Sequence, residues 1–170
     1  MNTEWMGRYR PLVAALVQHA NAAGRSASIK REIPDGIFLN SHEWQVLEYI
    51  VEHEWDDDCM LHISERLAIP QSTFSKSVKV LHGYGLVDKY QMLGNKKNII
   101  LKPTAYGKEV YSIRAPRTYE RTFKPFFEAL DELDDRSLDI VVNAICLLNS
   151  KVGRQNPPRE LVKMDEEQKP

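Results

Sequence analysis

The sequence predicts a mostly helical fold that carries one small β-hairpin near its centre. Three observations support this fold class. Apolar residues recur at helical spacing in several stretches, helix start and stop signals separate these stretches, and two short strand-like runs flank a glycine-containing turn. The 170 residues are 42% hydrophobic and 28% charged, which is an ordinary balance for one or two globular domains.

The N-terminal part of the chain is expected to form one helix followed by a long connection. Apolar residues recur at helical spacing over residues 4–23, where Pro11 either kinks the helix or marks its true start, and Gly24 is expected to end it. Residues 25–39 show no clear period and contain a turn at residues 34–36. A helix and an irregular connection therefore precede the central region.

A well-marked helix start follows this connection. The side chain of Asn40 can cap a helix, and Glu43 stands three residues later, as in a capping box. An acidic loop at residues 56–58 is expected to end this helix. Its apolar face, which we expect in the core, consists of Trp44, Leu47, Ile50, Val51 and Trp55.

Two further helices are expected in the central region. A short helix covers residues 62–67, and Pro70 suits the first turn of a second helix over residues 71–82, which Gly83 and Gly85 end. The buried stripe of the second helix is formed by Phe74, Val78 and Leu81.

A two-stranded hairpin is expected after the second helix. Its strands cover residues 86–92 and 98–102, and residues 93–97 form its tip. The order helix, short helix, tight break, helix and hairpin is that of a winged helix-turn-helix. In this motif the second helix enters the major groove of DNA and presents side chains to base edges.

Helical sequence returns after the hairpin. Pro116 and Pro125 are expected to kink or split a helical stretch that ends near residue 133, and a last helix covers residues 135–151. The apolar face of this last helix, which we expect to be buried against a partner chain, consists of Leu138, Val141, Val142, Ile145 and Leu148.

The distribution of charge supports an anionic ligand for the central region. The whole chain has a net charge of −1, but residues 71–102 hold six basic residues and one acidic residue, while residues 43–70 carry a net charge of −7. A chance cluster of solvated lysines is the alternative explanation of the basic block. The candidate DNA-binding residues, taken from the outer face of the second helix and from the hairpin tip, are Gln71, Ser72, Thr73, Ser75, Lys76, Lys79, Asn95, Lys96 and Lys97.

These segments resemble the MarR family of bacterial transcription regulators. Residues 39–47 (LNSHEWQVL) resemble the entry to the family's DNA-binding domain, and residues 68–78 (AIPQSTFSKSV) resemble its recognition-helix segment. Residues 81–87 match the helix exit into the wing, and the Thr-x-x-Gly at residues 104–107 resembles the segment after the wing. The resemblance covers residues 39–107 in detail.

The sequence departs from the family pattern at four places, one of which is the pair of prolines, Pro116 and Pro125, that interrupts the helix after the wing. Asn95-Lys96-Lys97 stands where the family often has Asp-Arg-Arg, and lysine is a weaker bidentate ligand than arginine. Val80, which we expect on the outer side of the second helix, stands where a basic residue is common. The connection at residues 25–39 is longer than usual. These departures affect the operator sequence and the dimer geometry more than the fold.

The resemblance implies a homodimer whose terminal helices pair with those of a second copy. Residues 1–24 and 108–153 would be dimerisation helices, residues 39–107 a winged helix-turn-helix, and residues 154–170 a disordered tail. Such a dimer would bind a palindromic operator in double-stranded DNA and act as a transcriptional regulator, more often a repressor. The resemblance also implies release from DNA by a small-molecule effector.

Other functions have weaker support in the sequence. A winged-helix adaptor for protein interaction is one alternative, although an adaptor does not need a lysine-rich face. A metal-responsive regulator or metal enzyme is another, and its candidate ligands would be His53, Asp56, Asp57, Asp58, Cys59 and His62. No enzyme motif, cofactor motif or tight metal-ligand pair is present, so we predict no catalytic residue, no cofactor and no metal.

The two cysteines do not form a disulfide framework. Either could act as a redox sensor, but aspartates beside Cys59 should raise the pKa of its thiol, and Cys146 is expected in the core. Neither a secretory signal nor an apolar run long enough to cross a membrane is visible. A cytoplasmic location with no membrane partner is therefore expected.

Overall fold

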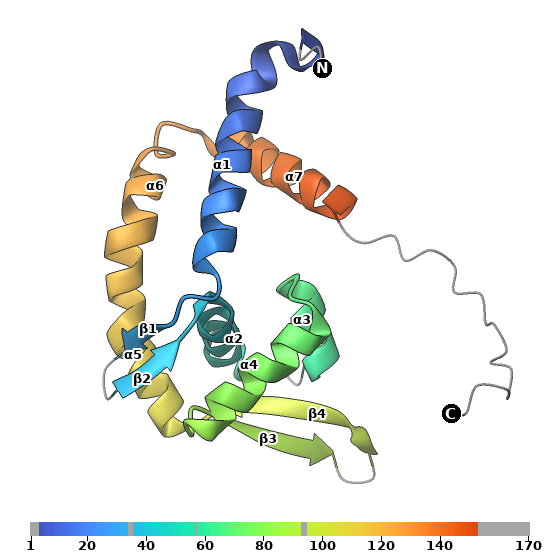
Figure 1. Cartoon of the computed structure of the whole chain (residues 1–170), viewed down its shortest axis with the longest axis vertical. Coiled ribbons are helices and arrows are strands. Elements are labelled where there is room, and N and C mark those ends of the chain that lie inside the picture. The colour runs from blue at the N-terminus through green and yellow to red at the C-terminus, as the bar shows by residue number, and fades with distance from the viewer. Residues whose placement is uncertain (1–3, 34–35, 57, 93–94, 153–170) are drawn as a thin grey trace, which may run out of the picture. The chain divides into compact units, whose positions relative to one another are not determined.

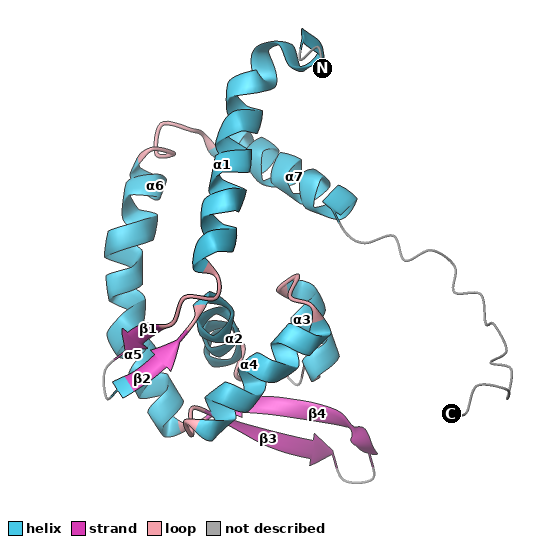
Figure 2. Cartoon of the chain, viewed as in Figure 1, coloured by secondary structure: helices cyan, strands magenta, loops and turns pink. Residues whose placement is uncertain are grey.

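The computed structural model describes residues 4–33, 36–56, 58–92 and 95–152, without the side chains of residues 4, 5, 92, 95–98 and 150–152. This part of the chain is mostly helical and holds two separate two-stranded antiparallel sheets (Figures 1 and 2). The predicted fold class is thereby confirmed. The chain divides into two compact units, Met1–Glu120 and Arg121–Pro170.

The first unit begins with a 3-10 helix, η1 (Glu4–Tyr9), and helix α1 (Arg10–Ser26). Pro11 lies in the first turn of α1 and so marks the start of the helix rather than a kink. The prediction that Gly24 ends this helix is wrong. Gly24 does not adopt the positive φ that makes glycine useful at a helix end, and the helix continues to Ser26.

A small β-hairpin follows α1 where the sequence predicted only an irregular connection. Strand β1 (Arg31–Ile33) pairs antiparallel with β2 (Ile37–Leu39), and Gly36 has a φ of 74° at the turn. The side chains of Ile33, Ile37 and Leu39 are at most 3% exposed and belong to the same core as the central helices. Three-residue strands are too short to show a readable alternation, so periodicity alone could not find them.

Helix α2 (Ser41–Glu52) has the predicted capping box. The backbone N–H of Glu43 donates to Asn40 Oδ1 at 2.9 Å, and the backbone N–H of Asn40 donates to Glu43 Oε2 at 2.7 Å. Trp44, Leu47 and Ile50 are buried and Val51 is half-buried, as predicted. Trp55 is instead 88% exposed, because α2 ends at Glu52 and the helical period does not extend to it.

Helices α3 (Met60–Arg66) and α4 (Gln71–Gly83) form the helix-turn-helix with α2. The tight break between them passes through Ala68, which has a φ of 51°, and then through Pro70, whose carbonyl accepts the N–H of Phe74 at 2.9 Å. The predicted stripe of Phe74, Val78 and Leu81 is completely buried. This stripe therefore packs α4 against the core.

The wing consists of β3 (Val87–Met92) and β4 (Asn95–Pro103), paired antiparallel. Strand β4 begins earlier than predicted because Asn95 pairs with Met92, so residues 95–97 lie in a strand and not in the tip. Cys59, just before α3, forms an isolated bridge with Ile100. This bridge joins the loop before α3 to the wing.

Helix α5 (Ala105–Thr118) follows the wing through a Thr-x-x-Gly turn. The Thr104 hydroxyl donates to the Gly85 carbonyl at 2.7 Å and accepts the Gly107 N–H at 2.9 Å. A Cβ on Gly107 would lie within 2.1 Å of the Leu86 carbonyl oxygen. This close approach is the physical reason for glycine at the fourth position of the turn.

The second unit contains α6 (Lys124–Glu128) and α7 (Asp135–Val152), and the π-helical turn η3 (Tyr119–Phe123) joins it to α5. The predicted splitting at prolines is confirmed, since Pro116 lies near the end of α5 and Pro125 in the first turn of α6. Helix α7 matches the predicted last helix. None of the described helices is long and apolar enough to span a membrane.

Candidate nucleic-acid interface

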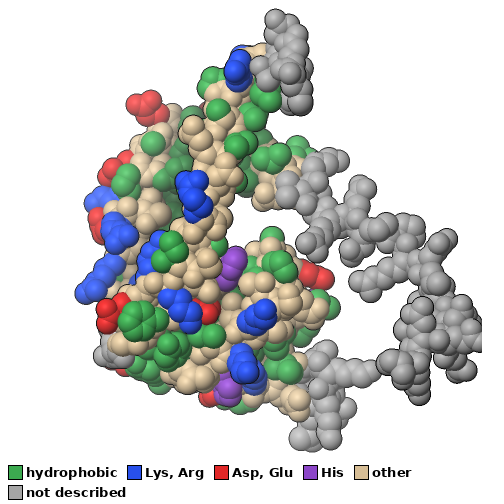
Figure 3. Space-filling view, viewed as in Figure 1, with side chains coloured by type: hydrophobic (Ala, Val, Ile, Leu, Met, Phe, Trp, Pro, Cys, Tyr) green, Lys and Arg blue, Asp and Glu red, His purple; other side chains and the backbone are tan. Residues whose placement is uncertain are grey.

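The outer face of α4 is polar and basic. Phe74, Ser77, Val78 and Leu81 are buried, so the opposite side of the helix faces solvent. The predicted DNA-binding residues on this helix that are exposed are Gln71, Ser72, Ser75, Lys76 and Lys79. Thr73 is half-buried, and no carboxylate occurs in α4. Figure 3 shows lysine or arginine side chains over this helix.

One residue of α4 does not follow the predicted pattern. Val80 was expected on the outer side, but it is half-buried and packs against the core. It lies three positions after Ser77, which is 3% exposed, so the two residues share one side of the helix beside the buried stripe. Val80 therefore packs against the core at the position where the family pattern often has a basic residue.

The wing contributes basic residues with different surroundings. Lys89 on β3 is exposed. Lys102 on β4 is directed inward to the acidic loop, where its ammonium donates to the Glu54 carbonyl at 2.7 Å and to the Asp56 carbonyl at 3.4 Å. Lys102 is therefore one of the six basic residues of the basic block, but its hydrogen bonds hold the acidic loop to the wing.

The three predicted wing-tip residues cannot be placed as contacts. The backbone of Asn95, Lys96 and Lys97 forms the start of β4, and their side chains lie outside the described part of the structure. Their assignment as DNA-binding residues stays a prediction.

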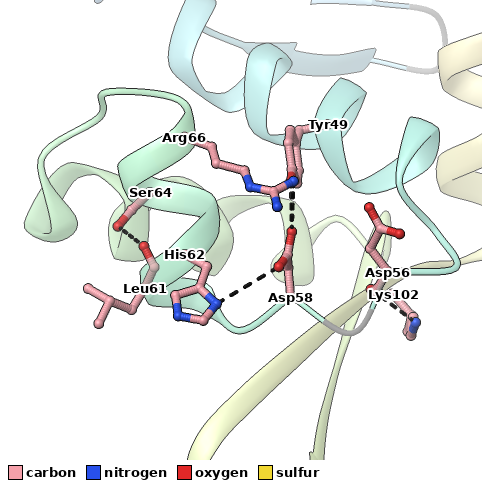
Figure 4. Close-up of polar contacts among 8 residues, drawn as sticks. All are labelled: Tyr49, Asp56, Asp58, Leu61, His62, Ser64, Arg66 and Lys102. Carbon is pink, nitrogen blue, oxygen red and sulfur yellow. Dashed lines mark hydrogen bonds and ion pairs between the residues drawn. The ribbon is translucent and has the colours of Figure 1, made fainter.

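The acidic segment after α2 is organised by a tyrosine and an arginine (Figure 4). The Tyr49 hydroxyl donates to Asp58 Oδ2 at 2.8 Å and accepts from Arg66 Nη1 at 2.8 Å. Arg66 also lies 3.3 Å from Asp58 Oδ2, and His62 Nδ1 lies 3.9 Å from Asp58 Oδ1. Burial and the hydrogen bond to Asp58 raise the pKa of Tyr49, so the phenol stays protonated and keeps donating. This network ties α2, the loop and α3 together.

Three of the six candidate metal ligands in the sequence, His53, Asp58 and His62, have contacts in or beside this network. Asp58 is engaged by Tyr49 and Arg66, and His53 Nδ1 lies 3.0 Å from the Tyr49 carbonyl oxygen. Among the described residues, no group of three His, Cys, Asp or Glu side chains comes together as a metal site. Asp57 lies outside the described residues.

The two cysteines are distant in the sequence and differ in solvent exposure. Cys59 is half-buried at the start of α3, and Cys146 on α7 is exposed. The prediction of a core position for Cys146 is therefore wrong. Cys146 borders the apolar face of α7, and that face is itself uncovered in the single chain.

Solved structures with a similar fold were found, although no protein-family model and no curated protein matches the sequence. The zinc-responsive MarR family member ZitR of Lactococcus lactis is 17% identical, with a TM-score of 0.57, over 84% of this chain and 97% of ZitR. ZitR in complex with DNA gives a TM-score of 0.58 at 16% identity, covering 86% of this chain and 98% of ZitR.

A third structure agrees with these two. A MarR/EmrR family transcriptional regulator from Acinetobacter sp. ADP1 is 18% identical, with a TM-score of 0.57, over 89% of this chain and 98% of that protein. The helix-turn-helix, the wing and the order of the flanking helices are thus shared over most of the length of each protein. The chain has the winged-helix fold of the MarR family of transcriptional regulators.

Proposed function

We propose that this protein binds double-stranded DNA in a sequence-specific way and regulates transcription. The observation that carries the proposal is the outer face of α4, which is exposed, free of carboxylates and provided with lysines and hydroxyls. A helix of this kind fits the major groove, and its buried stripe leaves the polar side chains on the side that faces solvent. The DNA-bound structure of ZitR, which shares the fold, supports DNA binding by a protein of this fold.

The residues of α4 divide into two roles. Lys76 can donate to the acceptor atoms of guanine, whereas Ser72 and Thr73, near the start of the helix, can reach bases or phosphates. Gln71, Ser75 and Lys79 complete the proposed DNA-binding set on α4. In the wing, Asn95, Lys96 and Lys97 would contact the DNA backbone or a minor groove.

The finer parts of the proposal concern assembly. A single winged helix-turn-helix makes few base contacts, and a two-fold dimer doubles them on a palindromic operator. The apolar face of α7 supports a homodimer, because its five residues are 37–50% exposed in the single chain. Repression, and release of DNA by a small-molecule effector, are proposed from the family resemblance.

Selection of bound fragments from genomic DNA, followed by affinity measurements on one selected fragment and on a random duplex, tests the function. Lys76→Ala should weaken binding to the selected fragment by about 1–3 kcal/mol and binding to random DNA much less. Lys108→Ala serves as the control, since it removes a lysine from α5 that contacts Glu54.

Two results would contradict the proposal. The absence of any duplex binding by the folded protein would exclude a DNA-binding function and favour a protein-interaction module. Equal weakening of both affinities by Lys76→Ala would instead make Lys76 a phosphate contact and overturn its role in base reading.

A further inference from the structure

A basic segment that the sequence motifs left unexplained leads into the β1–β2 hairpin. Residues 25–31 hold three basic side chains, Arg25, Lys30 and Arg31, and the acidic Glu32 follows on β1. We propose that Arg31, with Lys30 beside it, forms a second contact to the DNA backbone on the face of the molecule that presents α4. This inference rests on the proposed DNA-binding function and adds a site to it.

The hairpin is fixed to the helix-turn-helix. Ile33, Ile37 and Leu39 are buried in the core that also contains Phe74 of α4. The backbone N–H of Ser41, at the start of α2, donates to the Ala27 carbonyl at 3.3 Å, which holds the segment before β1. A charge on β1 is therefore held in a set position relative to α4, as a backbone clamp requires.

The charges of the hairpin are incompletely neutralised. Lys30 Nζ lies 3.9 Å from Glu43 Oε1, at the outer limit of an ion pair, and its side chain stays 48% exposed. The same carboxylate is already engaged by the Asn40 N–H in the capping box. The Arg31 side chain is exposed, and within the described part of the chain it has no hydrogen bond or ion pair.

Lys and Arg side chains of the hairpin region and of α4 are visible from the same side. In Figure 3, blue Lys and Arg side chains lie over α4 and, together with red Asp and Glu side chains, over the region of the β1–β2 hairpin. Figure 1, seen from the same direction, draws the hairpin to the left of α4 and the wing below α4. A duplex that meets α4 on this face would thus be flanked by the wing and by the hairpin.

The chemistry of Arg31 fits a phosphate. The guanidinium group is planar, always charged and able to bind two phosphate oxygens at once. The phosphates of a duplex offer such a partner at every step regardless of sequence. The contact should therefore add to affinity for all DNA and should not select among bases.

A salt titration on a random duplex tests the contact. The salt dependence of binding is measured for the wild type, Arg31→Ala, Arg31→Lys and the control Arg117→Ala, which removes an exposed arginine from the last turn of α5. Arg31→Ala should lower the log–log slope by about one unit for each bound protomer. Arg31→Lys should keep the wild-type slope, and Arg117→Ala should not change it.

Two controls separate this inference from the function on which it rests. Thermal melts of all variants establish that the hairpin is folded, and Lys76→Ala reports on α4 alone. If Lys76→Ala weakens binding to the selected fragment while the Arg31→Ala slope equals that of the Arg117→Ala control, DNA binding stands and the hairpin contact is overturned. If the wild type binds no duplex, both proposals fail together.

Discussion

Glu43 and Glu48 lie on the same helix but have different surroundings. Glu43 is 4% exposed, and its carboxylate accepts the Asn40 N–H and faces Lys30. Glu48 is half-buried, and burial together with the nearby charge of Glu52 raises its pKa. The anion of Glu48 therefore costs folding free energy.

This difference predicts a pH-dependent effect of Glu48→Gln. A pKa that is higher in the folded than in the unfolded state destabilises the fold at every pH above it, and the penalty disappears as the pH falls through the folded pKa toward the unfolded value of about 4.3. Glu48→Gln should raise the melting temperature at pH 7 and leave it unchanged below about pH 4. Glu65→Gln, an exposed carboxylate on α3, is the control. Equal stabilisation at both pH values would show that ionisation of Glu48 is not the cause.

At the scale of elements, one hydroxyl group links α3 to α2 and to the loop between them. Tyr49 on α2 donates to Asp58 in the loop and accepts from Arg66 at the end of α3. Tyr49→Phe removes both hydrogen bonds but keeps the ring, which stacks on His53 at a centroid distance of 4.1 Å. The free energy of unfolding should fall by about 1–2 kcal/mol, because two hydrogen bonds to charged groups are lost in a partly solvated site.

A urea titration measures this change. Tyr84→Phe removes a hydroxyl from a tyrosine that is 37% exposed just after α4, and it should leave stability nearly unchanged. Equal stability of Tyr49→Phe and the wild type would show that water replaces the network without cost.

The wing is the second element for which a contribution to DNA binding can be measured. Lys96 and Lys97 follow the start of β4, and we expect both to act on phosphates because lysine is a compact charge without a planar fork. The double change to alanine should weaken binding to all duplexes alike and lower the salt slope by about two units for each bound protomer. A slope that stays at the wild-type value would place the wing away from the DNA backbone.

At the scale of the whole molecule, the second unit ends in a helix that the single chain leaves uncovered. Leu138, Val141, Val142, Ile145 and Leu148 share one face of α7 and are 37–50% exposed. A continuous apolar face on a folded helix favours a partner surface, which the proposed homodimer supplies.

The oligomeric state should therefore depend on this face. Ile145→Asp should give monomers with little operator binding, because it places a charge in the middle of the apolar face. Asn143→Asp adds the same charge on the opposite side of α7 and should leave the dimer intact. Sedimentation of both variants and of the wild type measures the result. A wild-type chain that stays monomeric at micromolar concentration would contradict the homodimer.

The sequence by itself determined the features that depend on neighbours close in the chain. The capping box of Asn40 and Glu43, the buried stripe of α4 and the hairpin after it were all predicted, because each is specified by residue type and spacing within one element. The lysine-rich outer face of α4 follows from the same stripe. Residue type and spacing alone therefore predict the central part of the candidate site.

Only the tertiary structure decided the features that depend on distant segments. The β1–β2 hairpin exists through cross-strand pairing and burial against the central core, and Lys102 is taken up by the carbonyls of Glu54 and Asp56 on a loop more than 40 residues earlier. Val80 packs against the core, although the helical period predicted it on the outer side. Trp55 is exposed, although the helical period predicted it in the core. Periodicity describes which side of a helix is apolar, but burial also requires a second surface at that place, and that surface is supplied by folding.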